Sequence, residues 1–319
     1  MIVVAGEALI DLVVSAEGQR AVPGGSPANV AVTLARLDEP VRLLARIGTD
    51  EYGRQLTEYL SANRVDLAWA VRADEPTSVA VATLNAAGQA SYEFRLAGTA
   101  DWQWTPQELP ELAGSPATAL HTGSLALALA PGAQVLEGLL AREHRRDGLT
   151  VSIDLNLRPS IVTDRAAEQA RVRRQVGLAH LVKASDEDLA WLYPDRTVSD
   201  VLAGWREAGV SCAVVTRGGE GAWLLAPDGA LLEQPVVRTT VVDTVGAGDS
   251  FTGGLLAALA ALDALGDRPA DRLAAVTAQQ WAEVLRQAAT VAALTCGRRG
   301  ADPPRRAEVE ALLHPTTTS

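Results

Sequence analysis

The sequence predicts an α/β fold of three layers, in which helices cover both faces of a mostly parallel central sheet. The first observation is that short, apolar, β-branched runs alternate along the chain with longer helical patterns. The second is that these runs are apolar throughout, as expected for strands buried on both faces. The predicted strands are IVVAG, VRLLARIG, TALHTG, LTVSIDLN, HLVKAS and CAVVTRG, and the predicted helices include ANVAVTLARL, EYGRQLTEYLSAN, GAQVLEGLLAREHRR and VSDVLAGWREAG.

A third observation adds a small β-sheet to this fold. Residues 77–96 form two alternating, strand-like segments around the turn NAAG at 85–88, which is the pattern of a β-hairpin. Residues 9–25 have a similar character, and we expect them to pair with the hairpin as a lid. Because no internal repeat or low-complexity linker divides the chain, we expect one domain over residues 1–319, with lid strands from about 9–25 and 77–97.

The composition indicates an acidic, globular, intracellular protein. A formal net charge of −11 argues against a nucleic-acid partner, since phosphate backbones require clustered Lys and Arg. Cys212 and Cys296 lack CxxC or disulfide-framework spacing, which fits a reducing cytoplasm. The first residues, MIVVAGEALIDLVV, contain Glu7 and Asp11 and no basic segment, so we expect neither a signal peptide nor a membrane partner. The expected location is therefore the cytoplasm.

Several classes of site lack their sequence signals. The only lysine, Lys183, stands in HLVKAS, which is not a GxxxxGK[ST] phosphate loop. The four histidines form no zinc-ligand spacing, and the first strand is not followed by GxGxxG. The sequence GDS at 248–250 resembles a block of one serine esterase class. No histidine has an aspartate three residues before it, however, so Ser250 would lack its usual base.

The stretch VVDTVGAGDSF at 241–251 places an acidic residue between a glycine-rich turn and a long apolar run. We expect a strand to end at residues 241–242 and a helix to begin at about Asp249. The first N–H groups of such a helix have no intrahelical acceptor, and the helix dipole favours an anion there. The residues alone leave two roles for Asp249. It is either an N-terminal cap worth about 1 kcal/mol or a general base beside an anion-binding loop.

Together with GGSPANVAVTLARL at 24–37, this stretch resembles the paired signatures of the PfkB, or ribokinase-like, carbohydrate kinase family. Within that family the sequence is most similar to fructokinases, which have similar PGGSPANVAVxLARL and DxNLRP blocks. The resemblance extends over nearly the whole chain and implies a ribokinase-like α/β fold. Its further blocks are GEALIDL near the start, IGTDEYGRQL at 47–56, DLNLRP at 154–159, VKASDEDL at 182–189, TRGGEGAWL at 216–224 and RRGADP at 298–303.

The resemblance implies the catalytic groups. Asp249 would be the base that deprotonates a primary hydroxyl of the sugar. Gly246, Ala247 and Gly248 would stabilise the transferred phosphoryl group. A carboxylate beside an anion-binding loop is suited to direct phosphoryl transfer, so no covalent intermediate is implied.

The same resemblance assigns the sugar pocket to Asp11, Gly24, Gly25 and Asn29. Sugar hydroxyls need short carboxylate and amide partners, and paired glycines let a ring lie against the backbone. Asn29 has an alternative explanation as a polar residue early in a helix, because Pro27 suits a helix start.

Two arginines are candidates for contacting substrate or phosphate. Arg95 lies in the predicted hairpin and Arg158 lies in DLNLRP. Guanidinium groups match carboxylate and phosphate oxygens, and the chain has no lysine to spare. A solvated surface position is the alternative for either side chain.

For ATP, the resemblance points to Ser185 and Asp188 and to the turn that contains Thr216, Gly218 and Gly221. Asp188 would act through water on Mg²⁺, because one carboxylate together with substrate phosphates suffices for that ion. The acidic sequence DEDL at a helix start explains the same residues without a metal.

A monovalent cation is a further expectation. Asp243 begins the loop, and in related kinases the equivalent turn and the segment around Gly300 enclose such an ion, here K⁺. The alternative is that Arg298 and Arg299 supply the positive charge.

These observations predict an ATP-dependent sugar kinase that phosphorylates a primary hydroxyl, with O6 of D-fructose as the expected acceptor. A 2-dehydro-3-deoxygluconate kinase would use much the same blocks, with arginines at the substrate carboxylate, and a ribokinase or nucleoside kinase is also open. A non-catalytic sugar or nucleotide sensor is the alternative from another class, but binding alone would not require a base. Exposed lid strands would also allow a homodimer.

Overall fold

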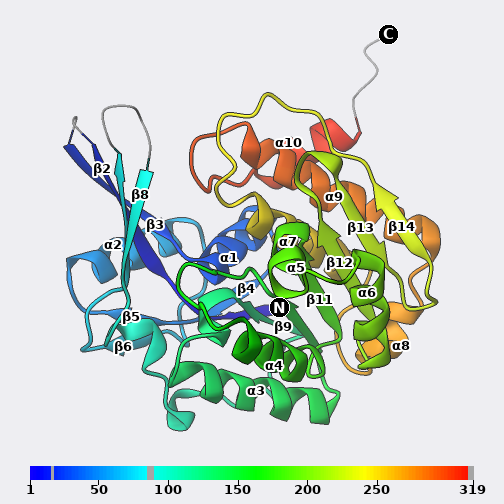
Figure 1. The fold of residues 1–319 in the computed structure, drawn as a ribbon, viewed down its shortest axis with the longest axis horizontal. Helices are drawn as coiled ribbons and strands as arrows, with labels where there is room; N and C mark the ends of the chain where they lie inside the picture. The colour runs from blue at the N-terminus through cyan, green and yellow to red at the C-terminus, as the bar shows by residue number, and fades with distance from the viewer. Residues whose placement is uncertain (16–17, 85–89, 315–319) are drawn as a thin grey trace.

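The computed structural model describes residues 1–15, 18–84 and 90–314 (Figure 1). Its central sheet has eight strands in the order β14-β13-β12-β11-β10-β9-β1-β4. The pairs from β4 through β12 are parallel, and β13 and β14 are added antiparallel at one edge. The strands are β1 Ile2–Ala5, β4 Val41–Leu44, β9 Ala119–Gly123, β10 Thr150–Asp154, β11 Leu181–Ser185, β12 Cys212–Thr216, β13 Ala222–Leu225 and β14 Leu231–Gln234. The predicted mostly parallel sheet is confirmed.

Helices cover both faces of this sheet, because its strands are apolar on both sides. In β1, Ile2 and Val4 pack into one buried cluster, and Val3 and Ala5 pack into another. The first cluster includes residues of α1, α7 and α9, and the second includes residues of α3, α4, α5 and α6. The helices are α1 Ser26–Arg36, α2 Glu51–Ala62, α3 Gly132–Arg146, α4 Arg165–Val176, α5 Asp186–Leu192, α6 Val198–Glu207, α7 Ala247–Ala261, α8 Pro269–Ala274, α9 Ala278–Cys296 and α10 Arg306–Leu313.

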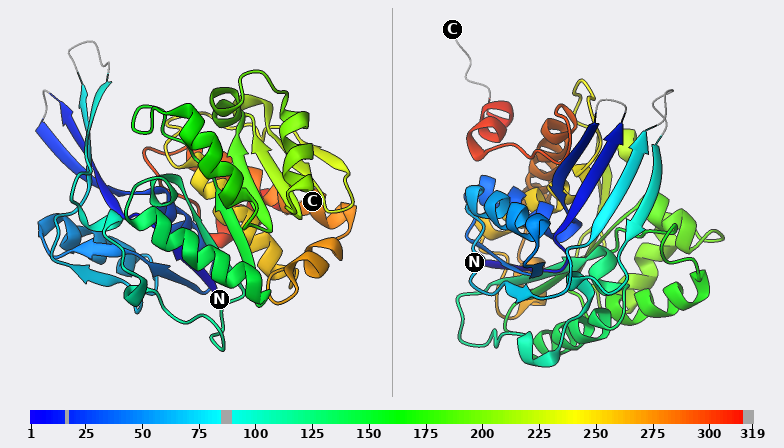
Figure 2. Two further views of the ribbon diagram at one scale, coloured as in Figure 1. Left: turned by 60° about the horizontal axis from the view of Figure 1, so that its bottom comes forward. Right: turned by 90° about the vertical axis from the view of Figure 1, so that its left-hand side faces the viewer.

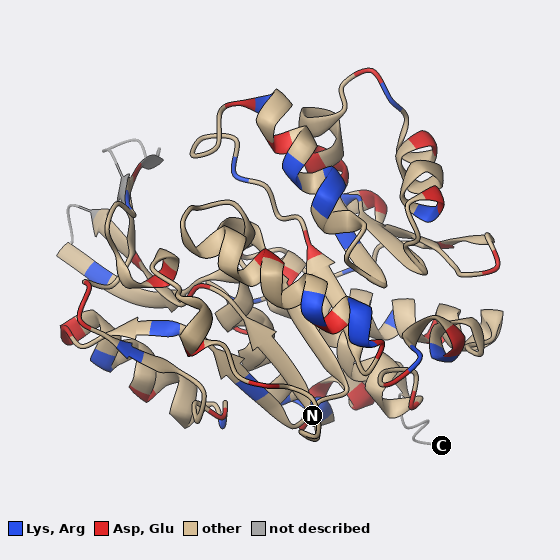
Figure 3. Cartoon of the chain, turned by 90° about the horizontal axis from the view of Figure 1, so that it is seen from below, with Lys and Arg blue, Asp and Glu red and all other residues tan. Residues whose placement is uncertain are grey.

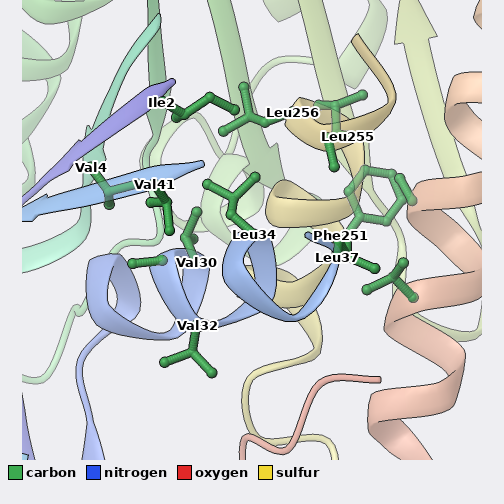
Figure 4. Close-up of a cluster of buried hydrophobic side chains, with 14 of the residues drawn as sticks. Ile2, Val4, Val30, Val32, Leu34, Leu37, Val41, Phe251, Leu255 and Leu256 are labelled. Carbon is green, nitrogen blue, oxygen red and sulfur yellow. The ribbon is translucent and has the colours of Figure 1, made fainter. Parts of the chain in front are cut away.

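The cluster around α1 and α7 fixes the helix that begins at the glycine-rich loop. Figure 4 shows Leu34 of α1 facing Leu255 and Leu256 of α7, with Ile2 of β1 beside Leu256. Leu34, Leu255 and Leu256 are fully buried, and truncating such a leucine to alanine typically costs about 2–5 kcal/mol. The apolar packing therefore holds the start of α7 against α1.

A small four-stranded sheet projects from the body of the molecule (Figures 1 and 2). Its order is β3-β2-β7-β8, with β2 and β7 parallel and the two outer pairs antiparallel. The turn predicted at 85–88 lies outside the described residues. The strands are β2 Leu9–Ser15, β3 Gly18–Gly24, β7 Val79–Leu84 and β8 Ala90–Arg95; a separate pair is formed by β5 Arg46–Gly48 and β6 Val71–Ala73.

The strand expected to end at residues 241–242 is not formed. After β14 the chain is irregular up to α7, and Val241 and Val242 are 63% and 59% exposed. Val242 and Asp243 donate their N–H groups to the carbonyl of Cys296, at the end of α9, rather than to a strand. The β-branched run therefore crosses the end of a helix, which the local pattern does not reveal.

Charges are distributed over the whole molecule. Figure 3 shows Lys and Arg interspersed with Asp and Glu along the helices. None of the helices in the described part of the chain has the length and apolar character needed to cross a bilayer.

Candidate active site

A cavity of about 370 Å³ lies where the small sheet meets the start of α1 and the start of α7. Parallel α/β sheets place their ligand sites at the carboxyl ends of the strands, and the segments after β1, β9 and β10 all contribute here. The predicted site residues that line the cavity are Asp11, Gly25, Asn29, Arg158, Gly246, Gly248 and Asp249. Candidate residues from four separate segments of the sequence therefore line one cavity in the structure.

The Asp249 carboxylate is the most constrained group in the cavity. Its Oδ1 accepts a hydrogen bond from Ser26 Oγ at 2.7 Å, and its Oδ2 accepts one from Asn29 Nδ2 at 2.8 Å. Asn156 Nδ2 lies 3.4 Å from Oδ1. Burial raises the pKa of Asp249 above its ordinary value, while the bonds from Asn29 and Ser26 lower it. The carboxylate is held in one orientation and is a stronger base than a solvated aspartate.

Unpaired backbone amides lie directly beside this carboxylate. Within residues 1–15, 18–84 and 90–314, the N–H groups of Gly246, Gly248 and Asp249 have no acceptor, whereas Ala247 donates to the carbonyl of Thr244 at 3.2 Å. Such free donors at a helix start attract an anion. The loop around the Asp249 carboxylate therefore keeps hydrogen bonds available for a phosphate.

Gly246 needs to be glycine for two reasons. It has φ 75°, in the left-handed region, and a Cβ there would lie 2.5 Å from Cβ of Ala301. The close approach to Ala301, next to Gly300, sets the direction in which the loop enters α7.

Asp11, Arg158 and Glu7 also line the cavity. Burial raises the pKa of Asp11 to about 6, and the Arg158 charge opposes that shift. Burial also raises the pKa of Glu7 to about 7. A Cβ on Gly24 would lie 2.2 Å from Oδ2 of Asp11, so Gly24 makes room for that carboxyl although it does not line the cavity itself.

Arg95 is not brought to the cavity. Its side chain is 61% exposed and pairs with Glu93 on the same strand, with Nε 2.9 Å from Oε1. The neighbouring Phe94 lines the cavity instead. Successive side chains of a strand point to opposite faces, so the position of Phe94 in the cavity lining directs Arg95 away from the cavity.

Ser185 and Asp188 form a capping box at the start of α5. Ser185 Oγ accepts the N–H of Asp188 at 3.0 Å, and Asp188 Oδ2 accepts the N–H of Ser185 at 2.9 Å. The other oxygen of Asp188 accepts the N–H of Leu157 at 2.9 Å. Each carboxylate oxygen of Asp188 thus accepts a backbone N–H, which favours the helix-start interpretation of DEDL.

The turn predicted to hold ATP follows β12. Thr216 pairs in register with Ser185, so the two candidate nucleotide segments lie at neighbouring strand ends. Gly218 and Gly221 both have positive φ, and a Cβ on Gly221 would lie 2.0 Å from the carbonyl oxygen of Gln234. The glycines allow a tight turn at this edge of the sheet.

Asp243 connects the loop to the segment at Gly300. Its Oδ2 accepts the N–H of Gly300 at 2.8 Å, and its Oδ1 accepts the N–H of Val245 at 3.1 Å. Arg298 pairs with Glu308, and its Nη1 lies 3.8 Å from Oδ2 of Asp302. In the described part of the chain no cluster of three or more His, Cys, Asp or Glu could hold a metal ion. A cation at this loop would depend on backbone carbonyls.

Sequence reasoning missed some of the cavity residues. Ser26 and Asn156 contact Asp249, and both stand inside blocks that carry the family resemblance, GGSPANV and DLNLRP. The sequence marks Glu7 only as a charge in the first segment. Ser124, which follows β9, lines the cavity with φ 55°, a strained value for a residue with a side chain. No local pattern singles out Ser124, because its backbone conformation is set by tertiary structure.

This fold, with a buried carboxylate and free amides at one helix start, defines a phosphate-transferring enzyme of the ribokinase-like class. The chain belongs to the pfkB family of carbohydrate kinases, whose family model matches residues 1–307. It is an ATP-dependent sugar kinase. The family assignment made from the sequence motifs is confirmed.

Relatives and solved structures agree with this assignment. The chain is 37% identical to a fructokinase of Rhizobium leguminosarum bv. trifolii over 264 residues, which cover 81% of this chain and 79% of that protein. The crystal structure of a Xylella fastidiosa fructokinase with bound ATP superposes with a TM-score of 0.89 at 28% identity, covering 98% of this chain and 97% of that chain. A Vibrio cholerae O395 fructokinase double mutant, in a form with fructose, ADP and potassium ion bound, has a TM-score of 0.85 at 29% identity, with coverages of 98% and 97%.

Proposed function

We propose that this kinase transfers the γ-phosphate of ATP to O6 of D-fructose, with Asp249 as the general base. The observation that carries the proposal is the position of the Asp249 carboxylate, which lines the cavity beside the free N–H groups of Gly246 and Gly248. A base and an anion-binding loop at one point are what direct phosphoryl transfer requires.

The reaction uses these groups in one displacement. The sugar hydroxyl gives its proton to Asp249, its oxygen forms a bond to the γ-phosphorus, and the bond between that phosphorus and the ADP oxygen breaks. Ser26 and Asn29 hold the carboxylate in place through its two oxygens. The free amides donate to the phosphoryl oxygens as ADP leaves, so charge is stabilised without a covalent enzyme intermediate.

The charge in the cavity favours a neutral sugar over a sugar acid. Nη1 of Arg158 donates to Oδ1 of Asn156 at 2.5 Å and to the carbonyl of Leu157 at 3.0 Å. The Arg158 charge also faces the carboxyl groups of Glu7 and Asp11. A substrate carboxylate would meet Asp11 and Asp249, while Arg158 is the one cation among the described residues that line the cavity, which is electrostatically unfavourable. This supports fructose rather than 2-dehydro-3-deoxygluconate, in agreement with the names of the similar kinases.

We further propose that the small sheet acts as a lid within a single kinase domain. Asp11 of β2, Ala80 of β7 and Phe94 of β8 contribute to the cavity, so the sheet covers the sugar end. Its outer strands β3 and β8 have free edges within the described residues, which could join a second copy. Sedimentation of the purified protein tests this homodimer.

A cytoplasmic location is proposed on the free Cys212 and Cys296.

Two ions belong to the proposal. Mg²⁺ would reach the site with the phosphates of ATP and retain water ligands, with Asp188 acting through water. K⁺ would sit at the loop joined by Asp243 and Gly300, where carbonyl oxygens remain as ligands. A comparison of kcat in KCl and NaCl tests the potassium site. Equal rates in the two salts would remove K⁺ from the proposal.

The decisive experiment measures ADP release with fructose, glucose, ribose, 2-dehydro-3-deoxygluconate and adenosine. We expect the highest kcat/KM with fructose. A higher kcat/KM with another acceptor would reassign the substrate while leaving the kinase chemistry intact. An absence of ADP release with every acceptor, from protein that still binds fructose and ATP, would indicate the sensor instead.

A further inference from the structure

Lys183 and Asp154 form a buried ion pair beneath the glycine-rich loop. The Nζ of Lys183 lies 2.7 Å from Oδ2 of Asp154, and the two side chains are only 5% and 1% exposed. The residues stand directly opposite each other in the parallel pairing of β10 and β11. The pair is therefore positioned by the central sheet rather than by a loop.

Burying such a pair is expensive compared with burying apolar side chains of similar size. The choice of lysine is also unusual in this chain, because Lys183 is its only lysine among 28 basic residues. Lysine differs from arginine in carrying a compact ammonium group with three freely rotating donors. Because the only lysine of the chain is buried in this pair, we looked for a role of Lys183 other than stabilising the fold.

The ammonium group lies directly against the anion-binding loop. A Cβ built on Gly248 would be 3.1 Å from Nζ of Lys183. Thr252, in α7, donates to Oδ2 of Asp154 at 3.1 Å and so ties the pair to the same helix. A cation near the N-terminus of a helix is disfavoured by the helix dipole. The position of Lys183 therefore opposes the stability of α7 and strengthens the attraction of its first turn for an anion.

The hydrogen bonding of the pair is incomplete. Of the three donors of Lys183, only the one to Asp154 has an acceptor among the residues that the structure describes. Asp154 Oδ1 is buried without any partner in the same part of the chain. Unsatisfied buried polar groups are rare in folded proteins and frequently mark functional positions. Gly248 lines the cavity, and the Lys183 Nζ lies 3.1 Å from where a side chain on Gly248 would begin, so a group bound at the loop is close enough to supply the missing acceptor.

We propose that Lys183 is a catalytic residue that donates a hydrogen bond to the phosphoryl group during transfer, and that Asp154 is the positioning residue that holds it. The inference rests on the proposed function, because it needs a phosphoryl group at the loop. The ammonium supplies a positive charge beside the loop, whereas Arg298, a sequence candidate for such a charge, pairs with Glu308. Charge that builds on the phosphoryl oxygens is then met by free amides on one side and by Nζ on the other.

The single lysine makes a direct spectroscopic test possible. Protein grown with [¹⁵Nζ]lysine contains one labelled side chain, which reports the surroundings of Lys183 alone. The probes are fructose alone, MgADP alone, and fructose with MgADP and tetrafluoroaluminate, which mimics the phosphoryl group in transfer. We expect the Nζ resonance to move with the third mixture and to stay near its free position with fructose alone. The same resonance in all three would overturn the proposal.

Kinetics of matched variants separate catalysis from folding. Lys183→Met should lower kcat on the order of 100-fold or more while KM for fructose changes little, and Asp154→Asn should lower kcat less because the ammonium remains. The control is Ser152→Ala. Ser152 lies in β10, as Asp154 does, and the change removes its buried hydrogen bond with His121 of β9; kcat should stay nearly unchanged. If Lys183→Met alone fails to fold, the double variant Lys183→Met with Asp154→Asn takes its place, because it leaves no unpaired buried carboxylate.

The outcomes distinguish this inference from the proposed function. Wild-type turnover of fructose combined with an unmoved Nζ resonance, or with full kcat in a folded Lys183 variant, would reject the role of Lys183 alone. Wild-type protein that releases ADP with none of the acceptors would reject both. A moved resonance together with a kcat effect in the variants would support both.

Discussion

The side-chain nitrogen of Asn29 lies 2.8 Å from Oδ2 of Asp249, across 220 residues of sequence. Asn29 was expected to bind the sugar; in the structure its side chain lines the cavity and donates to the carboxylate of the proposed base. Ser26 makes the matching contact to Oδ1 from the same helix start. The first turn of α1 thus positions the carboxylate that α7 carries, and the packing of α1 on α7 links the fold to the chemistry.

Replacing Asn29 is expected to change the pH dependence of the rate. The hydrogen bonds from Asn29 and Ser26 lower the pKa of Asp249. In Asn29→Ala that pKa should rise further, and more of the base is then protonated in mildly acidic solution. The rate at pH 6 should fall more than the rate at pH 8.5, which a pH profile of kcat measures. The control is Asn63→Ala. The side-chain amide of Asn63 forms hydrogen bonds with Tyr59 and Arg36, away from Asp249, so this variant should keep the wild-type profile. A uniform loss at every pH would contradict a role in tuning the base.

Asp249→Asn is expected to remove turnover while sparing nucleotide binding. The amide side chain can keep a similar shape but cannot accept the proton, so kcat should fall by roughly 10²–10⁴-fold, as is usual when a general base is lost. ADP release measures the rate, and calorimetry with ATP measures binding. Asp271→Asn, at a side chain that is 75% exposed, is the control for a lost surface charge. Ordinary turnover in the Asp249 variant would rule out the proposed base.

The layers of the fold could be predicted because they depend on local pattern. The run IVVA is buried at all four positions of β1, and an uninterrupted apolar run is the signal of a strand covered on both faces. Residues 241–242 have the same β-branched character but lie outside any strand. Val242 and the following Asp243 donate their N–H groups to the carbonyl of Cys296 at the end of α9, and a partner so far along the chain leaves no mark in the local sequence.

Some residues of the candidate site could likewise be predicted from local sequence, and others could not. Asp249 and its loop stand in one continuous stretch, so their proximity follows from the sequence alone. Lys183 and Asp154 meet only through the register of β10 and β11, and the sequence HLVKAS looks like an ordinary buried strand. Glu7 also lacks a signal of its own, because it is buried beside a distant segment in which Ala126 donates its N–H to Oε2 of Glu7 at 3.0 Å. Contacts made by tertiary structure are therefore what sequence reasoning missed.

Gly246→Ala is expected to impair both stability and catalysis. A residue with a side chain costs about 1–2 kcal/mol in the left-handed region, and the new Cβ would lie 2.5 Å from that of Ala301. The loop must shift to relieve this contact, which moves the free amides. Gly98→Ala is a matched control, because Gly98 has φ 68° with nothing within 4 Å of the added Cβ. Both variants should unfold at lower urea, and only Gly246→Ala should lose kcat. Equal activity of the two variants would argue against a role of the loop in catalysis.

Glu7→Gln is expected to change how stability depends on pH. Burial raises the pKa of Glu7 from 4.5 to about 7, with the Asp101 charge adding to the shift and Arg158 opposing it. Between these two values the folded protein keeps a proton that the unfolded chain releases. The free energy of unfolding of the wild type therefore falls as pH rises through this window, by up to roughly 3 kcal/mol relative to the glutamine variant.

Urea unfolding of both proteins at pH 4.5, 6 and 7.5 measures this difference. Asp11 and Asp101 also titrate near pH 6, but they are present in both proteins, so most of their contribution cancels. Glu111→Gln is a matched control with the same chemical change, because pairing with Arg146 lowers the pKa of Glu111 to about 2. Its stability difference from the wild type should be flat above pH 5. A flat difference for Glu7→Gln as well would mean that the Glu7 carboxyl ionises as readily in the folded protein as in water, and Glu7 would then carry its negative charge in the cavity at pH 6 and above.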